Sequence, residues 1–338
     1  MIQHNKPELG KEESLAVNKV LKSGMLAQGE EVKHFEDEFC NFLGLPIGHA
    51  VAVSSGTAAL YLALWALNAE NKNIAFPSYV CSALRHGVAM VGAKEHLVDI
   101  TSDSPNINLE IINKIKPDIA IIPHMYGIPV NVNSLEGIPI IEDCCQSLGA
   151  VIEGKSTGIN GDLGIFSFYA TKLMTTGGQG GMVVSKKKDF IESITDFREF
   201  DYRADNKKRF NFQMTDLQAT IGRQQLRKLP DFLERREKIY KMYKDSGLEL
   251  LDVQKNQRKK LIPVRYRTVL KTPSPQKTIK KLLKNNIRAI VPIEDWELLD
   301  DGLQCPNALK LTKNTVSIPC FPSLTNNDVK KIIKSIKS

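Results

Sequence analysis

Cysteine is scarce in this sequence, and its spacing excludes the common cysteine-built sites. The 338 residues include six cysteines, and no two of them form a C-x-x-C pair. Structural zinc sites and disulfide frameworks usually place cysteines at short, recurring spacings, so we predict reduced thiols and no metal ligand set. The six are Cys40, Cys81, Cys144, Cys145, Cys305 and Cys320.

Long hydrophobic runs are also absent. No apolar stretch reaches the length of a membrane span, and the first residues lack the basic and apolar pattern of a secretory signal. We therefore expect a soluble, cytoplasmic protein without a membrane partner. A hydrophobic fraction of 42% over 338 residues is enough for the core of one large or two moderate domains.

Acidic residues are few in the last quarter of the chain. Residues 251–338 hold 18 Lys and Arg against 7 Asp and Glu, a net charge of +11, whereas the whole chain carries +8. Most of these cations are lysines in amphipathic stretches such as KTIKKLLKNN and DVKKIIKSIKS. This pattern favours a solvated helix face over a nucleic-acid partner. A basic face could also attract a phosphorylated small molecule.

Apolar runs and helical segments alternate along most of the chain. The first fifty residues predict two helices that stop at Gly24 and Gly44. Strands are then expected near 50–55, 73–78, 94–100, 118–124, 138–145, 163–170 and 181–185, with helices between several of them. This alternation predicts an α/β fold with a mostly parallel sheet covered by helices.

The later part of the chain has a different pattern. A helix is expected from a capping box formed by Thr215 and Gln218, and a second helix after Pro230. Beyond about residue 245, two strand-like runs are each followed by a helix. We therefore predict a large domain at 1–245 and a small α+β domain at 246–338.

A lysine, Lys172, follows an apolar run and precedes four glycines at 177, 178, 180 and 181. The cluster is not a Walker A loop, because no Gly-Lys-Ser/Thr follows it, and it precedes a strand, unlike a Rossmann fingerprint. A surface lysine beside a flexible hairpin is one interpretation. The other is a reactive amine, since a partly buried lysine can form a Schiff base with a carbonyl cofactor.

Two other strand ends carry the chemistry that such a cofactor needs. The stretch SSGTAAL at 54–60 predicts a helix N-terminus that binds an anion, although an ordinary Ser/Thr helix cap also fits. In IIEDCCQSLGA, Glu142 and Asp143 end a buried strand and need a protonated partner, either a pyridine nitrogen or an arginine or lysine. Phosphate site, carboxylate and lysine in this order predict pyridoxal phosphate. The glycines would then let the backbone pass close to the cofactor.

Several stretches together resemble the DegT/DnrJ-type sugar aminotransferases. They are KSGMLAQGEEVKHFEDEF, VAVSSGTAALYLAL, FPSYVCSA, HMYGIP, IIEDCCQSLGA, GDLGIFSFYATKLMTTGGQGGMVV and FNFQMTDLQATIGRQQL. The resemblance implies a large domain of the aspartate-aminotransferase type (fold type I) and roles for individual residues. By position, Lys172 resembles the Schiff-base lysine, and Asp143 the partner of the pyridinium nitrogen. Gln146 would lie near the phenolic oxygen of the ring, and Tyr79 would stack on the ring.

The same resemblance implies how the phosphate is held. Gly56, Thr57 and Ser167 match phosphate-binding positions. Asn211 matches an asparagine that the partner subunit donates, which implies a homodimer with shared active sites. Two departures from the family pattern stand out: Gln213 replaces an arginine that often follows the asparagine by two residues, and the His-Tyr-Pro segment of the C-terminal domain is missing.

The reaction implied by this resemblance is a transamination in two halves. L-glutamate would convert the cofactor to pyridoxamine phosphate, and a nucleotide-linked keto-sugar would then accept the amine. The alternatives are another pyridoxal phosphate enzyme, such as a sugar dehydratase or an amino-acid aminotransferase, and a non-catalytic regulator with the same fold. Lys172 argues against the dehydratase branch of the family, in which a histidine replaces this lysine.

Overall fold

The computed structural model describes residues 1–300 and 302–338. Its α-helices are α1 (Lys11–Ser23), α2 (Glu30–Leu43), α3 (Gly56–Ala66), α4 (Ala83–Met90), α5 (Leu109–Ile115), α6 (Lys188–Arg198), α7 (Asp216–Asp245), α8 (Pro275–Lys284), α9 (Pro306–Thr312) and α10 (Asn326–Lys337). Its strands are β1 (Ala50–Val53), β2 (Asn73–Pro77), β3 (Lys94–Val98), β4 (Ile119–Pro123), β5 (Ile140–Asp143), β6 (Val151–Ile152), β7 (Lys155–Ser156), β8 (Leu163–Ser167), β9 (Gly181–Val184), β10 (Leu261–Ile262), β11 (Thr268–Lys271) and β12 (Thr315–Ile318).

A seven-stranded sheet forms the centre of the molecule, in the order β1-β9-β8-β5-β4-β2-β3. Strands β8, β5, β4, β2 and β3 pair in parallel, and β9 is antiparallel to both of its neighbours. The predicted mostly parallel sheet is therefore confirmed. Its inner strands read as continuous apolar runs because both faces are covered, as parallel sheets require.

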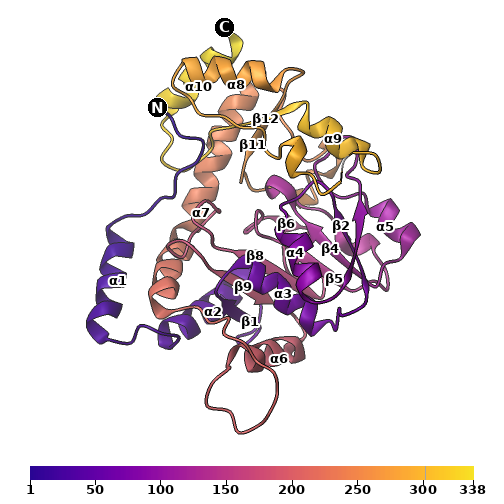
Figure 1. Cartoon of the computed structure of the whole chain (residues 1–338). Coiled ribbons are helices and arrows are strands. Elements are labelled where there is room, and N and C mark those ends of the chain that lie inside the picture. Colours follow the sequence, from indigo (N-terminus) through magenta and orange to yellow (C-terminus); the bar gives the residue numbers. More distant parts are fainter. Residues whose placement is uncertain (301) are drawn as a thin grey trace.

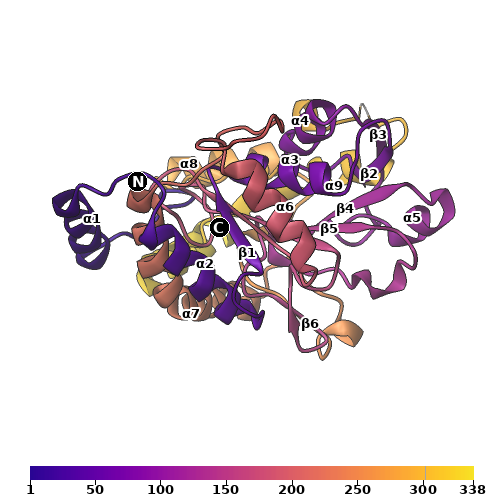
Figure 2. The same ribbon diagram turned by 90° about the horizontal axis from the view of Figure 1, so that it is seen from below.

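Helices cover the two faces of this sheet through different residues of each strand. Val51 and Val53 of β1 point to the same core as α3, α4 and α6, whereas Ala50 and Ala52 point to the core shared with α2 and α7. This alternation follows from the two-residue period of a strand. Helix α5 covers the far end of the sheet on the second face. Figure 1 and Figure 2 show these layers from two directions.

The prediction of a helix break at Pro230 is wrong. Helix α7 runs without interruption from Asp216 to Asp245, with Pro230 inside it. Its first half packs against α1 and α2, and its second half contacts α10, so tertiary packing on both sides of the proline outweighs the local cost of proline in a helix. The expected capping box of Thr215 and Gln218 is present at its start.

The C-terminal elements gather at the far end of α7 (Figure 1). Strands β11 and β12 pair antiparallel, and α8, α10 and the end of α7 share a separate apolar core with them. The first residues of the chain also belong to this region, because Ile2 pairs with Ile287. Among the described helices, none combines the length and the apolar composition needed to cross a membrane.

Candidate active site

Three strands bring most of the predicted site residues to one edge of the sheet. Strands β5 and β8 are parallel, and β1 runs in the same direction as β8 because β9 is antiparallel to both. Their carboxyl ends therefore meet. Gly56 follows β1, Asp143 ends β5 and Ser167 ends β8, with Lys172 on the loop beyond. Open α/β sheets bind ligands at this edge.

The N-terminus of α3 forms a cradle at this edge. Ser55 caps the helix, since its Oγ accepts the N–H of Ala58 at 3.1 Å. Among the described residues, this leaves the N–H groups of Gly56 and Thr57 for an anion. The interpretation of a Ser/Thr helix cap is therefore correct for Ser55, and the anion site at the next two residues stays a prediction.

Glycine is required at the bottom of the cradle. A Cβ on Gly56 would lie 2.7 Å from Cβ of Ser167 and 3.4 Å from Sγ of Cys145. A Cβ on Gly181 would lie 2.3 Å from the carbonyl oxygen of Ser55. At Gly181 the close approach that we predicted is therefore made to the protein's own backbone: the first residue of β9 packs against the turn that opens α3.

Lys172 lies between this edge and the C-terminal part of the chain. Its Nζ is 5.3 Å from the centroid of the Tyr266 ring. Burial lowers the pKa of Lys172, but Tyr266, Cys145 and Asp143 together outweigh it and raise the pKa above its ordinary value. The amine is thus surrounded by groups that can carry negative charge and holds a proton at neutral pH.

The two carboxylates at the end of β5 are both buried but have different partners. Asp143 is 8% exposed, and its Oδ1 accepts the N–H of Cys145 at 3.0 Å. Glu142 is fully buried, and its Oε2 lies 3.0 Å from Nε2 of His124. Burial raises the pKa of Glu142, but His124 and nearby backbone N–H groups lower it more strongly. The partner of Glu142 is therefore a histidine, not the arginine or lysine that we considered.

Gln146 is anchored beside the site through its side-chain carbonyl. Its Oε1 accepts the N–H of Tyr126 at 2.8 Å. Tyr126 has a left-handed backbone conformation, with φ of 59°. This conformation costs a non-glycine residue about 1–3 kcal/mol and occurs mainly where neighbouring groups enforce it. Gln146 is one of these groups.

Tyr79 lies in the core next to Tyr126. The side chain is fully buried in the core, and its hydroxyl accepts a hydrogen bond from Tyr126 at 2.7 Å. The stacking role of Tyr79 stays a prediction. Cys81, two residues later, is exposed and lies close enough to Lys172 to influence its pKa.

Asn211 is exposed. It belongs to the segment between α6 and α7, which projects away from the sheet in Figure 1. Its Oδ1 accepts the N–H of Gln213 at 3.1 Å. The neighbouring Phe212 accepts the N–H of Ser54 at 2.8 Å, which ties the end of this segment to the turn before α3.

Sequence reasoning missed the contribution of the C-terminal part. Tyr266 packs against Lys172, and the next residue, Arg267, places its guanidinium 5.6 Å from the same ring. The signal was the RYR triplet in LIPVRYRTVL, a tyrosine between two arginines in an otherwise apolar strand-like run. It could mark a site, but nothing in the sequence places it next to Lys172.

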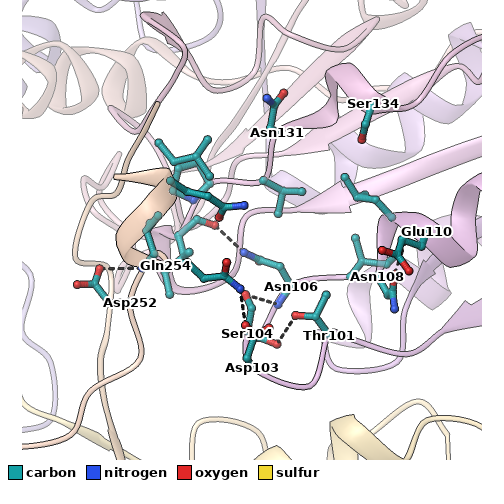
Figure 3. Close-up of a pocket in the computed structure, with 18 residues that line it drawn as sticks. Thr101, Asp103, Ser104, Asn106, Asn108, Glu110, Asn131, Ser134, Asp252 and Gln254 are labelled. Atoms are coloured by element: carbon teal, nitrogen blue, oxygen red, sulfur yellow. Dashed lines mark hydrogen bonds between the residues drawn. The ribbon is translucent and has the colours of Figure 1, made fainter. Parts of the chain in front are cut away.

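A separate cavity of about 380 Å³ lies between residues 101–110, 128–134 and 252–257 (Figure 3). Its main polar groups are paired within the protein: Asn106 donates to the carbonyl of Ile128 at 3.0 Å, and Gln254 donates to Asp103. The described residues that line it include no lysine or arginine and none of the predicted site residues. We therefore do not assign the predicted chemistry to it.

Comparisons with known proteins agree with this geometry. The chain is 31% identical to the uncharacterized protein MJ1066 of Methanocaldococcus jannaschii, over 98% of this chain and 96% of that protein. It is 28% identical to the GDP-perosamine synthase of Escherichia coli O157:H7, with the same coverage. The aminotransferase TlmJ from Streptoalloteichus hindustanus superimposes with a TM-score of 0.91 at 23% identity, over 99% of this chain and 98% of that one.

The likeness to TlmJ shows that the fold is that of the predicted aminotransferase class. The family model of these enzymes matches residues 7–337, which is nearly the whole sequence. The chain is therefore an aminotransferase and belongs to the DegT/DnrJ/EryC1/StrS aminotransferase family.

Proposed function

We propose that this protein is a pyridoxal phosphate-dependent aminotransferase that transfers the amino group of L-glutamate to a nucleotide-linked keto-sugar. The observation that carries the proposal is the convergence of Lys172, Asp143 and the cradle of Gly56 and Ser167 at one sheet edge. Relatives named GDP-perosamine synthase and UDP-4-amino-4,6-dideoxy-N-acetyl-beta-L-altrosamine transaminase support a nucleotide-sugar substrate.

The residues present fit pyridoxal phosphate. Gly56 and Thr57 offer backbone N–H groups and Ser167 a hydroxyl, which suits a phosphate. The cradle stays open because Gly56 has no side chain and cannot have one beside Ser167. Asp143 offers a carboxylate for the ring nitrogen, and Lys172 an amine for the aldehyde. Gln146 keeps its amide nitrogen available as a donor, since its carbonyl is bound by Tyr126.

When bound, the cofactor supplies an electron-accepting ring that stabilises negative charge at the donor's α-carbon. Asp143 holds the proton on the ring nitrogen and so maintains this capacity. Lys172 would hold the aldehyde through its Nζ. With the donor bound, the free Nζ would take the proton from the donor's α-carbon, a general base role worth roughly 10²–10⁴ in rate. The same atom returns a proton in the sugar half of the reaction.

Three further assignments belong to this proposal. We propose that the protein acts in the cytoplasm and forms a homodimer in which Asn211 reaches the phosphate of the partner's site. Asn211 is exposed and is therefore accessible to a partner subunit, which supports this arrangement. We also propose a large domain at 1–245 and a small domain at 246–338. The apolar core that β11, β12, α8 and α10 share apart from the large sheet supports this division.

The test is the absorption spectrum of the purified protein with pyridoxal phosphate, before and after addition of L-glutamate. We expect a visible band of lysine-bound cofactor that bleaches with L-glutamate and is absent in Lys172→Ala. Lys187→Ala is the matched control, because Lys187 is exposed and pairs with Asp162 at 2.6 Å. Protein that L-glutamate has bleached should regain the visible band when a nucleotide-linked keto-sugar that it accepts is added.

Failure at each stage has a separate meaning. Wild-type protein that takes up no cofactor would support the regulator alternative. Protein that binds the cofactor but ignores L-glutamate would require another donor or another reaction. Recovery of the band with 2-oxo acids only, and with none of the sugars, would identify an amino-acid aminotransferase.

A further inference from the structure

A small cavity of about 180 Å³ lies beside Lys172, where the first residues of the chain meet the C-terminal part. Thr171 and Tyr266 form the side toward the candidate active site. His4 and Asn5 form another side, and Arg267 supplies its charge. The cavity is thus built from four segments that are far apart in the sequence: residues 4–5, 171, 266–267 and 317–320.

Arg267 has an unusual state for a side chain that is not exposed. Its Nη1 is buried, and no hydrogen bond or ion pair of its guanidinium occurs among the described residues. Neighbouring arginines differ: Arg265 pairs with Glu237 and Asp252, and Arg236 donates to the carbonyl oxygen of Cys320. A buried charged donor without an acceptor costs more free energy than a neutral one. The simplest explanation for the unpaired Nη1 of Arg267 is therefore that it binds an acceptor supplied by a ligand.

The cavity has positive charge and no counter-charge. The guanidinium carbon of Arg267 lies 5.6 Å from the centroid of the Tyr266 ring, and Nζ of Lys172 lies 5.3 Å from the same centroid. None of the described residues that line the cavity is an aspartate or glutamate. An anionic group that enters would gain charge-assisted hydrogen bonds, which are about twice as strong as neutral ones.

Size and position indicate which anion this is. Pockets for drug-sized ligands occupy about 300–1,000 Å³, so a cavity of about 180 Å³ has no room for a whole nucleotide. A carboxylate fits. In an amino acid the α-carboxylate is bonded to the carbon that carries the reacting amine, so it must lie within a few ångströms of the place where Lys172 reacts.

We propose that Arg267 binds a carboxylate of the amino donor and that the N-terminal segment forms the outer wall of this donor subsite. The inference rests on the proposed function, because it assigns the donor half of that reaction to particular residues. Arg267 supplies the charge, and the polar groups of His4 and Asn5 face the same space.

The N-terminal segment is fixed in this position. Nδ2 of Asn5 donates to the carbonyl of Thr171 at 2.7 Å, directly before the reactive lysine. Nε2 of His4 lies 2.8 Å from Oγ of Ser317. Burial and the nearby arginines, Arg267 first among them, lower the pKa of His4 to about 3. The imidazole is therefore neutral at physiological pH. It bonds Ser317, which also lines the cavity, and adds no charge to the subsite.

The test uses the cofactor-loaded protein and maleate, a dicarboxylate that cannot react. We compare Arg267→Gln and Arg267→Lys with Arg288→Gln, a matched control in which an exposed arginine near His4 loses its charge outside the cavity. Calorimetry should give a Kd for maleate that rises roughly tenfold to a hundredfold in Arg267→Gln. The rise should be smaller in Arg267→Lys, and Arg288→Gln should match wild type.

Two further readouts separate the possible sources of the anion. The concentration of L-glutamate that half-saturates bleaching should rise in Arg267→Gln, while cofactor uptake and the binding of UDP, GDP and dTDP stay at wild-type values. Weakened nucleoside diphosphate binding with unchanged maleate binding would overturn the proposal, because Arg267 would then bind phosphate. Unchanged maleate binding in both Arg267 variants would overturn it as well.

The proposed function can fail separately. A wild-type protein that does not respond to L-glutamate contradicts the proposed function, and the donor subsite with it. A wild-type protein that responds, with an Arg267→Gln variant that responds equally well, contradicts only the donor subsite. Arg267→Lys keeps the test decisive if the glutamine variant does not fold, since it retains both charge and length.

Discussion

Nζ of Lys172 lies 5.3 Å from the centroid of the Tyr266 ring, so the loop after β8 contacts the C-terminal part of the chain. Each residue affects the other's charge. Burial raises the pKa of Tyr266, but Lys172 and Arg267 outweigh it and lower the pKa below its ordinary value. Tyr266 in turn is the largest of the groups that raise the pKa of Lys172. The contact therefore sets the protonation state of the amine.

The first prediction concerns Tyr266→Phe. This change keeps the ring and removes the phenol, so the pKa of Lys172 should fall. Only the neutral amine attacks an aldehyde, and the rate of cofactor capture should then rise at lower pH than in wild type. Stopped-flow absorbance across a pH series measures this. Tyr169→Phe, at a tyrosine that is 45% exposed, is the control. A pH–rate profile that is unchanged or moves to higher pH would show that Tyr266 does not raise the pKa of Lys172.

The second prediction concerns Asp143→Asn. The amide oxygen can still accept the N–H of Cys145, so the loop should keep its conformation, but the charge that holds a ring proton is lost. We expect the L-glutamate half-reaction to slow by roughly 10²–10³, the usual cost of removing one electrostatic group from an active site. Single-turnover absorbance measures it, with exposed Asp118→Asn as the control. A rate near wild type would remove Asp143 from the site.

The third prediction uses the buried pair of Glu142 and His124. The pKa of Glu142 is lowered in the folded protein, so its stabilisation is present above its ordinary pKa of 4.5 and is lost as pH falls below it. Glu142→Gln should therefore reduce the free energy of unfolding by about 3 kcal/mol at pH 7, and by less at pH 4. Urea unfolding at both pH values measures this. An equal loss of unfolding free energy at pH 7 and pH 4 would show that the ionised Glu142 does not stabilise the fold.

The sequence was informative where chemistry and local structure coincide. The strands predicted at 50–55, 138–145 and 163–170 are present, although the observed strands end earlier, at Val53, Asp143 and Ser167. The glycine stops at Gly24 and Gly44 were also correct, because both cap their helices in the left-handed conformation. These features depend on neighbours within a few residues, which a single sequence contains.

The errors came from contacts between distant segments. Arg267 and His4 were not selected, because their shared cavity forms only when the first residues of the chain meet β12. No local sequence pattern indicates such a contact between distant segments. The break predicted at Pro230 failed for the same reason, since packing at both ends of α7 is tertiary.

The fourth prediction follows from the continuous helix α7. Pro230 is exposed and removes one backbone hydrogen bond from the helix interior. Pro230→Ala should therefore raise the free energy of unfolding by about 1–3 kcal/mol. Urea unfolding measures this, and Lys238→Ala at an exposed position of the same helix is the control. Unchanged or reduced stability would mean that the core relies on a bend at Pro230.

The fifth prediction tests whether two subunits share each site. If Asn211 acts in the partner's site, Lys172→Ala and Asn211→Ala should each be inactive or nearly so as pure proteins. In a mixed dimer the two lesions fall in the same site, because the Asn211 variant donates its alanine to the site that already lacks the lysine. The other site is intact. Free subunit exchange should thus restore about one quarter of wild-type activity. If Asn211 acted within its own subunit, every mixed dimer would carry one lesion per site, and mixing would restore nothing.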